Sequence, residues 1–360
     1  MAYKALCSSA TERWLDDTGQ PFNIDRCIVV PDFEAPVTGI MKYIRGDYTS
    51  EVGERTVMIN HFDGAGMMLP KVMSRNVMCR GPWLKGLLTP FDYIKFCDVN
   101  NCPPVIKDRW GKEHDLVAED IQVIFTDSQL KLGKYYESWD DYKQKFKENN
   151  CHLCLTNYEE DYIKNSQMNY QFLCGLTEMT NEEIDQFCAK TQRHIESVCT
   201  TQEGMLDALG CNRDILQPYQ EALKLYPALL DLKQFRDKLK DIKTRMVLDA
   251  RSGSIKCRNK RLFAIPDCYA ACEFYFLHIN EPKGLLEDGW VAAREFRDVE
   301  EIDVLRSPCC GIEHCIRKVT KDPDIYRWFV SNGIYTSCHD LISRVLQFDE
   351  PKYVALISNG

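Results

Sequence analysis

The stretch from residue 120 to residue 136 reads DIQVIFTDSQLKLGKYY, and the sequence pattern changes there. Its first part, DIQVIFT, is a short run rich in Val and Ile, which is typical of a buried β-strand. Its second part gathers polar groups where that strand ends. Such groups either bind a nucleotide or cap a following helix, and the spacing favours neither. The polar residues are Thr126, Asp127, Ser128, Gln129 and Lys131.

Upstream of this stretch the chain repeats the same kind of pattern. Short apolar runs are separated by Gly, Pro and Asp, and each has the length and composition of a strand. The runs are CIVVPDF, RTVMINHF and KGLLTPFDYIKF. Together with DIQVIFT they predict a closed or strongly curved sheet over residues 1–134.

Downstream the apolar residues recur three and four positions apart, with charges between them, which predicts helices. Thr180 is a candidate N-cap because acidic residues fill the turn after it. In the run from 214 to 250, Pro218 fits a first helical turn, whereas Pro227 is expected to kink or divide the helix.

Strand-like runs return after RSGS, as RLFAIPD, CEFYFLHI, DVLRSP, LISRVLQF and KYVALIS. The predicted class is therefore α+β. We expect a β-rich domain over 1–134, a helical connector over 135–250 and a second β-rich domain over 251–360.

Composition narrows the class of protein. Of the 360 residues 44% are hydrophobic and 11% aromatic, as in ordinary globular proteins. No apolar run is long enough to span a membrane, and the first residues lack a signal-peptide core. The 18 cysteines are scattered through a long chain, which favours reduced thiols and predicts a cytoplasmic location. The net charge of -9 argues against a surface coated with basic residues, but it leaves room for a local basic channel.

Two stretches of the first β-rich segment combine glycine with charge. In HFDGAGMMLP, Asp63, Gly64 and Gly66 predict a tight turn that lets the backbone approach a ligand, or a hairpin turn without one. In VMCRGPWLKG, Arg80 and Lys85 stand near a strand end, where a lysine beside Gly86 either meets a phosphate or is an ordinary surface lysine.

Cysteine and basic clusters occur later in the chain. CHLC at 151–154 and CCGIEHC at 309–315 contain zinc-type ligands, but neither has a regularly spaced second half. Buried thiols are the plainer interpretation, and a zinc-stabilised interaction protein is the alternative. KQFRDKLKDIKTR is typical of a solvated helix face. RSGSIKCRNKRL predicts contacts between Lys256, Arg258 and a phosphate backbone, because no acidic residue interrupts it.

The order of these motifs resembles the catalytic region of the cellular RNA-dependent RNA polymerases, and in particular their compact bacterial and mobile-element members. The motifs are DGxG, RxxxxKG, SQxK, a helical span, LRSP and LQFD. The resemblance covers nearly the whole chain. It implies two double-psi β-barrels that face each other across an active site, joined by the helical segment, with the second barrel incomplete.

The resemblance also assigns roles to residues. Lys85 and Lys131 are the expected catalytic-cleft lysines, and Asp349 is the expected catalytic and metal-binding aspartate. Nucleotide or nucleic-acid contacts are expected at Asp63, Gly64, Gly66, Arg80, Gly86, Ser128, Gln129 and Arg306. The implied cofactor is Mg²⁺ or Mn²⁺, and the implied partners are single-stranded RNA or DNA and nucleoside triphosphates. The resemblance implies no membrane partner and leaves the oligomeric state open.

The metal-binding loop departs from the family pattern. Two-metal phosphoryl transfer requires clustered carboxylates, which the family places in a DxDGD loop. After LQF this chain has Asp349, Glu350, Pro351 and Lys352, so only the first aspartate stands where it is expected. Our hypothesis is a truncated or degenerate polymerase-family protein. A single-stranded nucleic-acid-binding protein without catalysis and a remnant without function are the alternatives.

Overall fold

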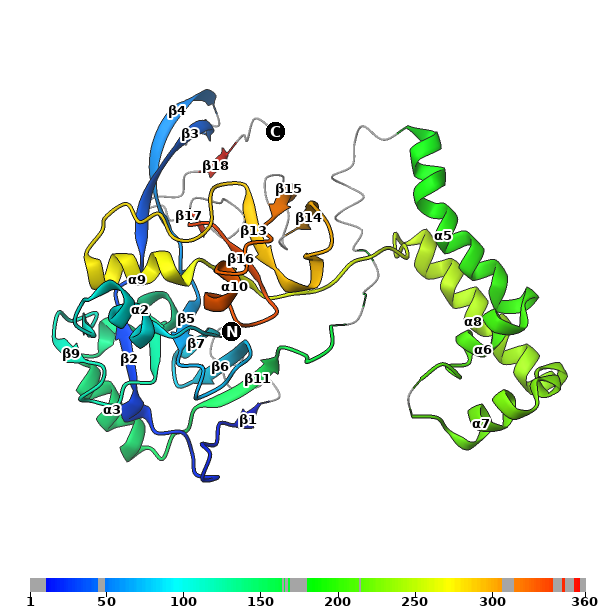
Figure 1. The fold of residues 1–360 in the computed structure, drawn as a ribbon, viewed down its shortest axis with the longest axis horizontal. Coiled ribbons are helices and arrows are strands. Elements are labelled where there is room, and N and C mark those ends of the chain that lie inside the picture. Colours follow the sequence, from blue (N-terminus) through cyan, green and yellow to red (C-terminus); the bar gives the residue numbers. More distant parts are fainter. Residues whose placement is uncertain are drawn as a thin grey trace. The chain divides into compact units, whose positions relative to one another are not determined.

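The structure is a computed structural model. It describes residues 11–44, 49–163, 165, 168, 180–213, 215–305, 314–338, 345–346 and 353–356. Among these residues, no helix has the length and apolar character required to cross a membrane. Figure 1 shows the chain as a ribbon.

The internal contacts divide the chain into two units. The first, here called the β unit, contains Met1–Asp161 and Leu262–Gly360, and the second, here called the helical unit, contains Tyr162–Arg261. This grouping by contact differs from the predicted three-part division at residues 134 and 250, which follows the sequence pattern and stays a prediction.

The largest sheet of the β unit has, in the described residues, the strand order β1-β11-β6-β7-β5-β10-β2. Its strands are β1 (Glu12–Arg13), β2 (Cys27–Val30), β5 (Ala65–Met68), β6 (Val77–Gly81), β7 (Leu84–Pro90), β10 (Val123–Thr126) and β11 (Cys154–Tyr158). β2 and β10 run parallel, and every residue of both is buried. A strand covered on both faces is apolar throughout, which explains the continuous runs CIVV and VIFT.

The rest of the β unit contains three further sheets in the described part of the chain, with orders β12-β16-β13-β15-β14, β17-β4-β3-β18 and β8-β9. Their strands are β3 (Glu34–Ile44), β4 (Ser50–Asn60), β8 (Val105–Lys107), β9 (Glu113–Asp115), β12 (Ala264–Pro266), β13 (Trp290–Ala293), β14 (Glu301–Leu305), β15 (His314–Val319), β16 (Ile334–Thr336), β17 (Val345–Leu346) and β18 (Tyr353–Leu356). Strands from the two ends of the sequence share a sheet, because β18 pairs with β3 and β17 with β4.

Helices occupy the connections. The α-helices are α2 (Tyr93–Asn100), α3 (Trp139–Glu148), α5 (Asn181–Thr200), α6 (Gln202–Ala208), α7 (Pro218–Leu225), α8 (Lys233–Arg251), α9 (Cys268–Leu277) and α10 (Ile325–Trp328). The 3₁₀ turns are η1 (Ile24–Arg26), η2 (Asp127–Gln129), η3 (Gly133–Tyr135), η4 (Pro227–Asp231) and η5 (Arg294–Phe296).

Two predicted strands are wrong. CEFYFLHI lies in α9, which begins after Asp267 because the Asp267 carboxylate accepts hydrogen bonds from the amides of Tyr269 and Ala270. Its residues are buried on most sides, so no polar face revealed a helical period. KGLLTPFDYIKF is a strand only as far as Pro90, after which Asp92 caps α2.

The main core joins both ends of the β unit. One cluster of buried side chains contains residues between Ile28 and Ile124 and residues between Ile265 and Cys338. α9 contributes most of its length to this cluster and contacts α2. A second cluster lies on the other face of the large sheet and includes the buried Trp139 of α3.

The helical unit has a smaller core of its own, built from α5, α6, α7 and α8. α5 and α8 run side by side, as Figure 1 shows. The helix starts in this unit are those predicted from the sequence. Thr180 and Glu183 form a capping box at the start of α5, and Pro218 occupies the first turn of α7. Pro227 separates α7 from α8, so the predicted division of the 214–250 run is confirmed.

Candidate functional site

The polar stretch after β10 forms a packed junction with two glycine-bearing strands. Gln129 is fully buried, and its amide group donates to the carbonyls of Leu87 (2.9 Å) and Gly64 (3.3 Å). Its side-chain oxygen accepts from the Thr126 amide at 3.1 Å. The Gln129 side chain therefore ties β10 to β7 and to the turn before β5, and its hydrogen-bonding groups are occupied by protein.

Two glycines make room for that amide. A Cβ on Gly66 would lie 2.6 Å from the Gln129 side-chain oxygen and 2.5 Å from the Ile124 carbonyl. A Cβ on Gly86 would lie 2.6 Å from the Gly64 carbonyl and would also collide with the Gln129 amide nitrogen. Both glycines thus permit a close approach between strands and a side chain of this chain.

Ser128 connects the junction to two charged groups. Its hydroxyl accepts from the Gly64 amide at 3.0 Å, and its own amide donates to the Asp32 carboxylate at 2.9 Å. The Lys131 ammonium donates to the Ser128 carbonyl. The Lys131 amide donates to the Trp83 carbonyl at 2.8 Å, which holds this lysine beside the start of β7.

Asp32 is the charged residue at this junction that sequence reasoning missed. Burial is the largest effect and raises the pKa of its carboxyl above the ordinary value, and the nearby Asp63 raises the pKa further. The hydrogen bonds from Ser128 and the charge of Lys131 lower it. The sequence did contain a signal. CIVVPD and VIFTD both end in aspartate, and β2 and β10 are parallel neighbours, so their carboxyl ends meet at one edge.

The same edge contains a partly buried ion pair. The Arg109 guanidinium contacts Asp127, and burial lowers the pKa of Arg109 while Asp32 opposes that change. Gly133 permits this arrangement, since a side chain there would collide with the guanidinium. The edge therefore carries Asp32, Asp63, Asp127, Arg109 and Lys131 within a short span.

Arg80 and Lys85 lie on the face of the large sheet that is turned toward the main core. They are register partners in β6 and β7, and side chains alternate along each strand. Their neighbours Cys79 and Leu84 pack into the second cluster, so both basic residues face the side of the main core. Within the described part of the chain, the Nε and Nη1 atoms of Arg80 are buried and have no hydrogen-bond partner. Arg80 as a whole is only half-buried, and these two nitrogens are able to donate to an anionic acceptor.

The other predicted site residues lie elsewhere. Lys256 and Arg258 belong to the helical unit, where the Lys256 amide donates to the Thr191 hydroxyl at 2.8 Å. Arg306 and Asp349 lie outside the described residues, as does most of the 309–315 cluster. The described residues contain no group of three or more His, Cys, Asp or Glu that is able to hold a metal ion.

Comparison with known proteins relates the chain to RNA polymerases. No protein-family model matches it. It is 41% identical over 361 residues to the protein named DNA-directed RNA polymerase YonO of Bacillus phage SPbeta, and the match covers 99% of this chain and 42% of that protein. Over nearly its whole length the chain is therefore similar to an RNA polymerase. It spans less than half of the curated relative it matches.

A solved structure supports the fold. The RNA-dependent RNA polymerase QDE-1 from Thielavia terrestris matches with a TM-score of 0.50 at 13% identity, over 88% of this chain and 33% of that one. The mixed α+β class and the resemblance to cellular RNA-dependent RNA polymerases are thereby confirmed.

Proposed function

We propose that the chain is a nucleotide- and nucleic-acid-binding region of a templated RNA-synthesising nucleotidyltransferase. The observation that carries the proposal is the 41% identity to a phage RNA polymerase across 99% of this chain. The activity is a proposal because the match covers 42% of that relative.

The basic groups of the β unit support phosphate binding. Arg80 has two buried guanidinium nitrogens without a hydrogen-bond acceptor among the described residues, and Lys85 is its register partner. An arginine fork and a lysine ammonium are the groups that proteins use to bind phosphates. We assign nucleotide or template phosphates to this pair, and we assign to Asp32 the positioning of Lys131 through Ser128.

The glycine and glutamine residues fit an indirect role. The amide of Gln129 is taken up by three protein contacts, and Gly66 and Gly86 border it. We therefore propose that they shape the strand ends that present Asp63 and Lys131 to the ligand.

The metal requirement is not met by the described residues. The family resemblance implies Mg²⁺ or Mn²⁺, and the described residues do not supply a cluster of acidic ligands. In the sequence, Pro351 and Lys352 follow Asp349 and Glu350, which restricts the backbone and adds a positive charge at the expected loop.

This departure favours a second candidate function, the binding of single-stranded nucleic acid without synthesis. It requires the basic groups but no metal, and its affinity should fall as salt rises. A cytoplasmic location stays a prediction from the scattered cysteines.

The test compares synthesis and binding by the same purified chain. Single-stranded RNA and DNA templates, with and without primer, are incubated with nucleoside triphosphates and Mg²⁺ or Mn²⁺. The variants are Asp349→Asn and Lys85→Ala, with Asp185→Asn, an exposed aspartate of α5, as the matched control. Synthesis lost in both variants and kept in the control supports the polymerase. Salt-sensitive binding without synthesis supports the second candidate, and the absence of both overturns both.

A further inference from the structure

The two units of the chain differ in charge. The helical unit contains 16 Lys and Arg against 13 Asp and Glu, whereas the remainder contains 29 against 41. The helical unit is therefore net positive although the protein as a whole carries a formal charge of -9. A positive module on an acidic protein attracts a polyanion locally.

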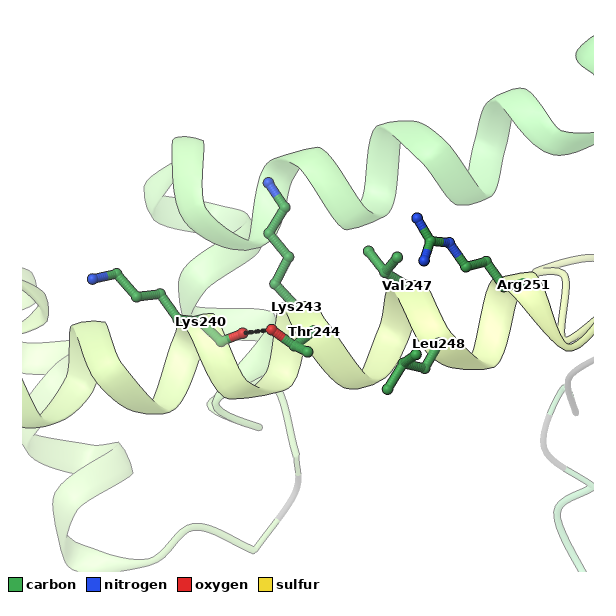
Figure 2. A pocket seen from close by; sticks show the side chains of 6 residues that line it. All are labelled: Lys240, Lys243, Thr244, Val247, Leu248 and Arg251. Atoms are coloured by element: carbon green, nitrogen blue, oxygen red, sulfur yellow. Dashed lines mark hydrogen bonds between the residues drawn. The ribbon is translucent and has the colours of Figure 1, made fainter.

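Much of this charge belongs to α8, and part of it surrounds a depression on the helix surface. The depression has a volume of about 510 Å³. Figure 2 shows its lining, which comes from one face of α8: Lys240, Lys243, Thr244, Val247, Leu248 and Arg251. The Thr244 hydroxyl donates to the Lys240 carbonyl at 2.9 Å, so it faces the helix backbone.

The cations of this face are available to a ligand. Within the described residues, no carboxylate lies within ion-pair distance of Lys240, Lys243 or Arg251, whereas Arg236 on the same helix pairs with Asp231 at 2.6 Å. With about 100° of rotation per residue, Asp249 projects away from the lined face and Asp241 lies at its border beside Leu248, whereas Asp237 lies on the face itself, without an ion pair to Lys240. The face is thus a basic stripe, with three cations that have no ion-pair partner among the described residues and one carboxylate, Asp237, near its first lysine.

The stripe has the length and chemistry for a nucleic-acid strand. Lys240 and Arg251 are eleven residues apart, which is about 16 Å along a helix. Val247 and Leu248 lie between them, and Leu248 is 57% exposed. The outer surface of a duplex offers mainly phosphates and sugars, whereas a single strand also exposes base faces to side-chain contacts.

We propose that this face of α8 binds the backbone of single-stranded nucleic acid, with Lys240, Lys243 and Arg251 on phosphates and with Val247 and Leu248 against sugars or bases. The proposal rests on the proposed function for its biological context, but it concerns a different surface. The sequence pattern KQFRDKLKDIKTR was interpreted above as a solvated face. The structure adds the segregation of unpaired cations around an apolar floor.

The test is fluorescence-anisotropy binding of the full chain to a labelled single-stranded oligonucleotide, without metal or nucleotides, over a series of salt concentrations. The variant Lys240→Gln with Arg251→Gln removes two cations from the stripe. The matched control, Lys238→Gln with Arg245→Gln, removes one lysine and one arginine from the other side of the same helix. Circular dichroism verifies that both variants keep their helical content.

We expect the stripe variant to reduce the slope of log affinity against log salt by about 1.4, since each lost phosphate contact on a single strand contributes about 0.7. The control should keep the slope of the unmodified chain. Equal losses in the two variants, unchanged binding by the stripe variant, preferential binding to duplex or failure of the unmodified chain to bind would each overturn the proposal. A parallel Lys85→Gln variant separates the two proposals, because it tests the β unit and leaves α8 intact.

Discussion

Replacement of Gln129 by alanine tests whether the polar stretch after β10 holds the β unit together. The side chain is fully buried and makes three hydrogen bonds, to the Thr126 amide and to the carbonyls of Leu87 and Gly64. In Gln129→Ala these three bonds are lost, although the Gly64 carbonyl keeps its hydrogen bond from the Leu87 amide at 2.8 Å. Because water does not reach this site freely, the loss is not compensated as it would be at the surface.

The size of the effect follows from these contacts. A neutral hydrogen bond contributes about 1 kcal/mol to stability, so three of them amount to about 3 kcal/mol. Gln129→Glu keeps the shape but replaces the donor by an oxygen that faces the Leu87 and Gly64 carbonyls. At neutral pH it should destabilise at least as much as alanine. Lowering the pH should recover part of the loss, because a buried carboxyl has a raised pKa and its protonated form donates one bond.

Urea unfolding followed by tryptophan fluorescence measures this effect selectively. All six tryptophans lie outside the helical unit, so their signal reports on the β unit. Gln144→Ala serves as the control because Gln144 is exposed on α3 and bonds to Glu148. If Gln129→Ala lowered the free energy of unfolding by no more than this control, about 0.5 kcal/mol or less, the structural role assigned to Gln129 would be refuted.

Three further predictions concern other elements. Gly86→Ala should lower the unfolding free energy of the β unit by about 1–3 kcal/mol, because the added Cβ meets the Gly64 carbonyl. Gly53→Ala is the control, since its added Cβ has no neighbour within 4 Å, and it should not lower the unfolding free energy. Urea unfolding of both variants measures the difference. Burial raises the pKa of Asp267 to about 6, so stability should fall as the pH rises from about 4 to about 6, and unfolding at several pH values should show a flatter profile for Asp267→Asn. Thr180→Ala removes the N-cap of α5 and should lower the unfolding free energy of the helical unit by about 1 kcal/mol. Thermal melting followed by circular dichroism should show a lower midpoint for this variant than for Thr244→Ala, the comparison.

Sequence reasoning succeeded where a pattern has one physical cause. The continuous apolar runs of β2 and β10 and the caps at Thr180 and Pro218 depend on local chemistry, and the structure contains them. It failed at α9, because a short apolar segment buried on most sides looks the same as helix or strand. Asp32 was missed because the aspartates that end CIVVPD and VIFTD come together only when β2 pairs with β10, and neither run by itself shows that pairing.

The motif residues of the β unit divide into scaffold and surface once their contacts are known. Gly66, Gly86 and Gln129 were singled out as ligand contacts, yet their geometry is explained by one another, since the glycines leave the space that the glutamine amide fills. A motif of this kind identifies the fold that positions a ligand site, and its residues contact one another. Two other groups differ from these: Arg80 has two buried nitrogens without a hydrogen-bond partner among the described residues, and burial raises the pKa of the Asp32 carboxyl. Their substitution should therefore change ligand binding more than stability, whereas the reverse should hold for Gln129.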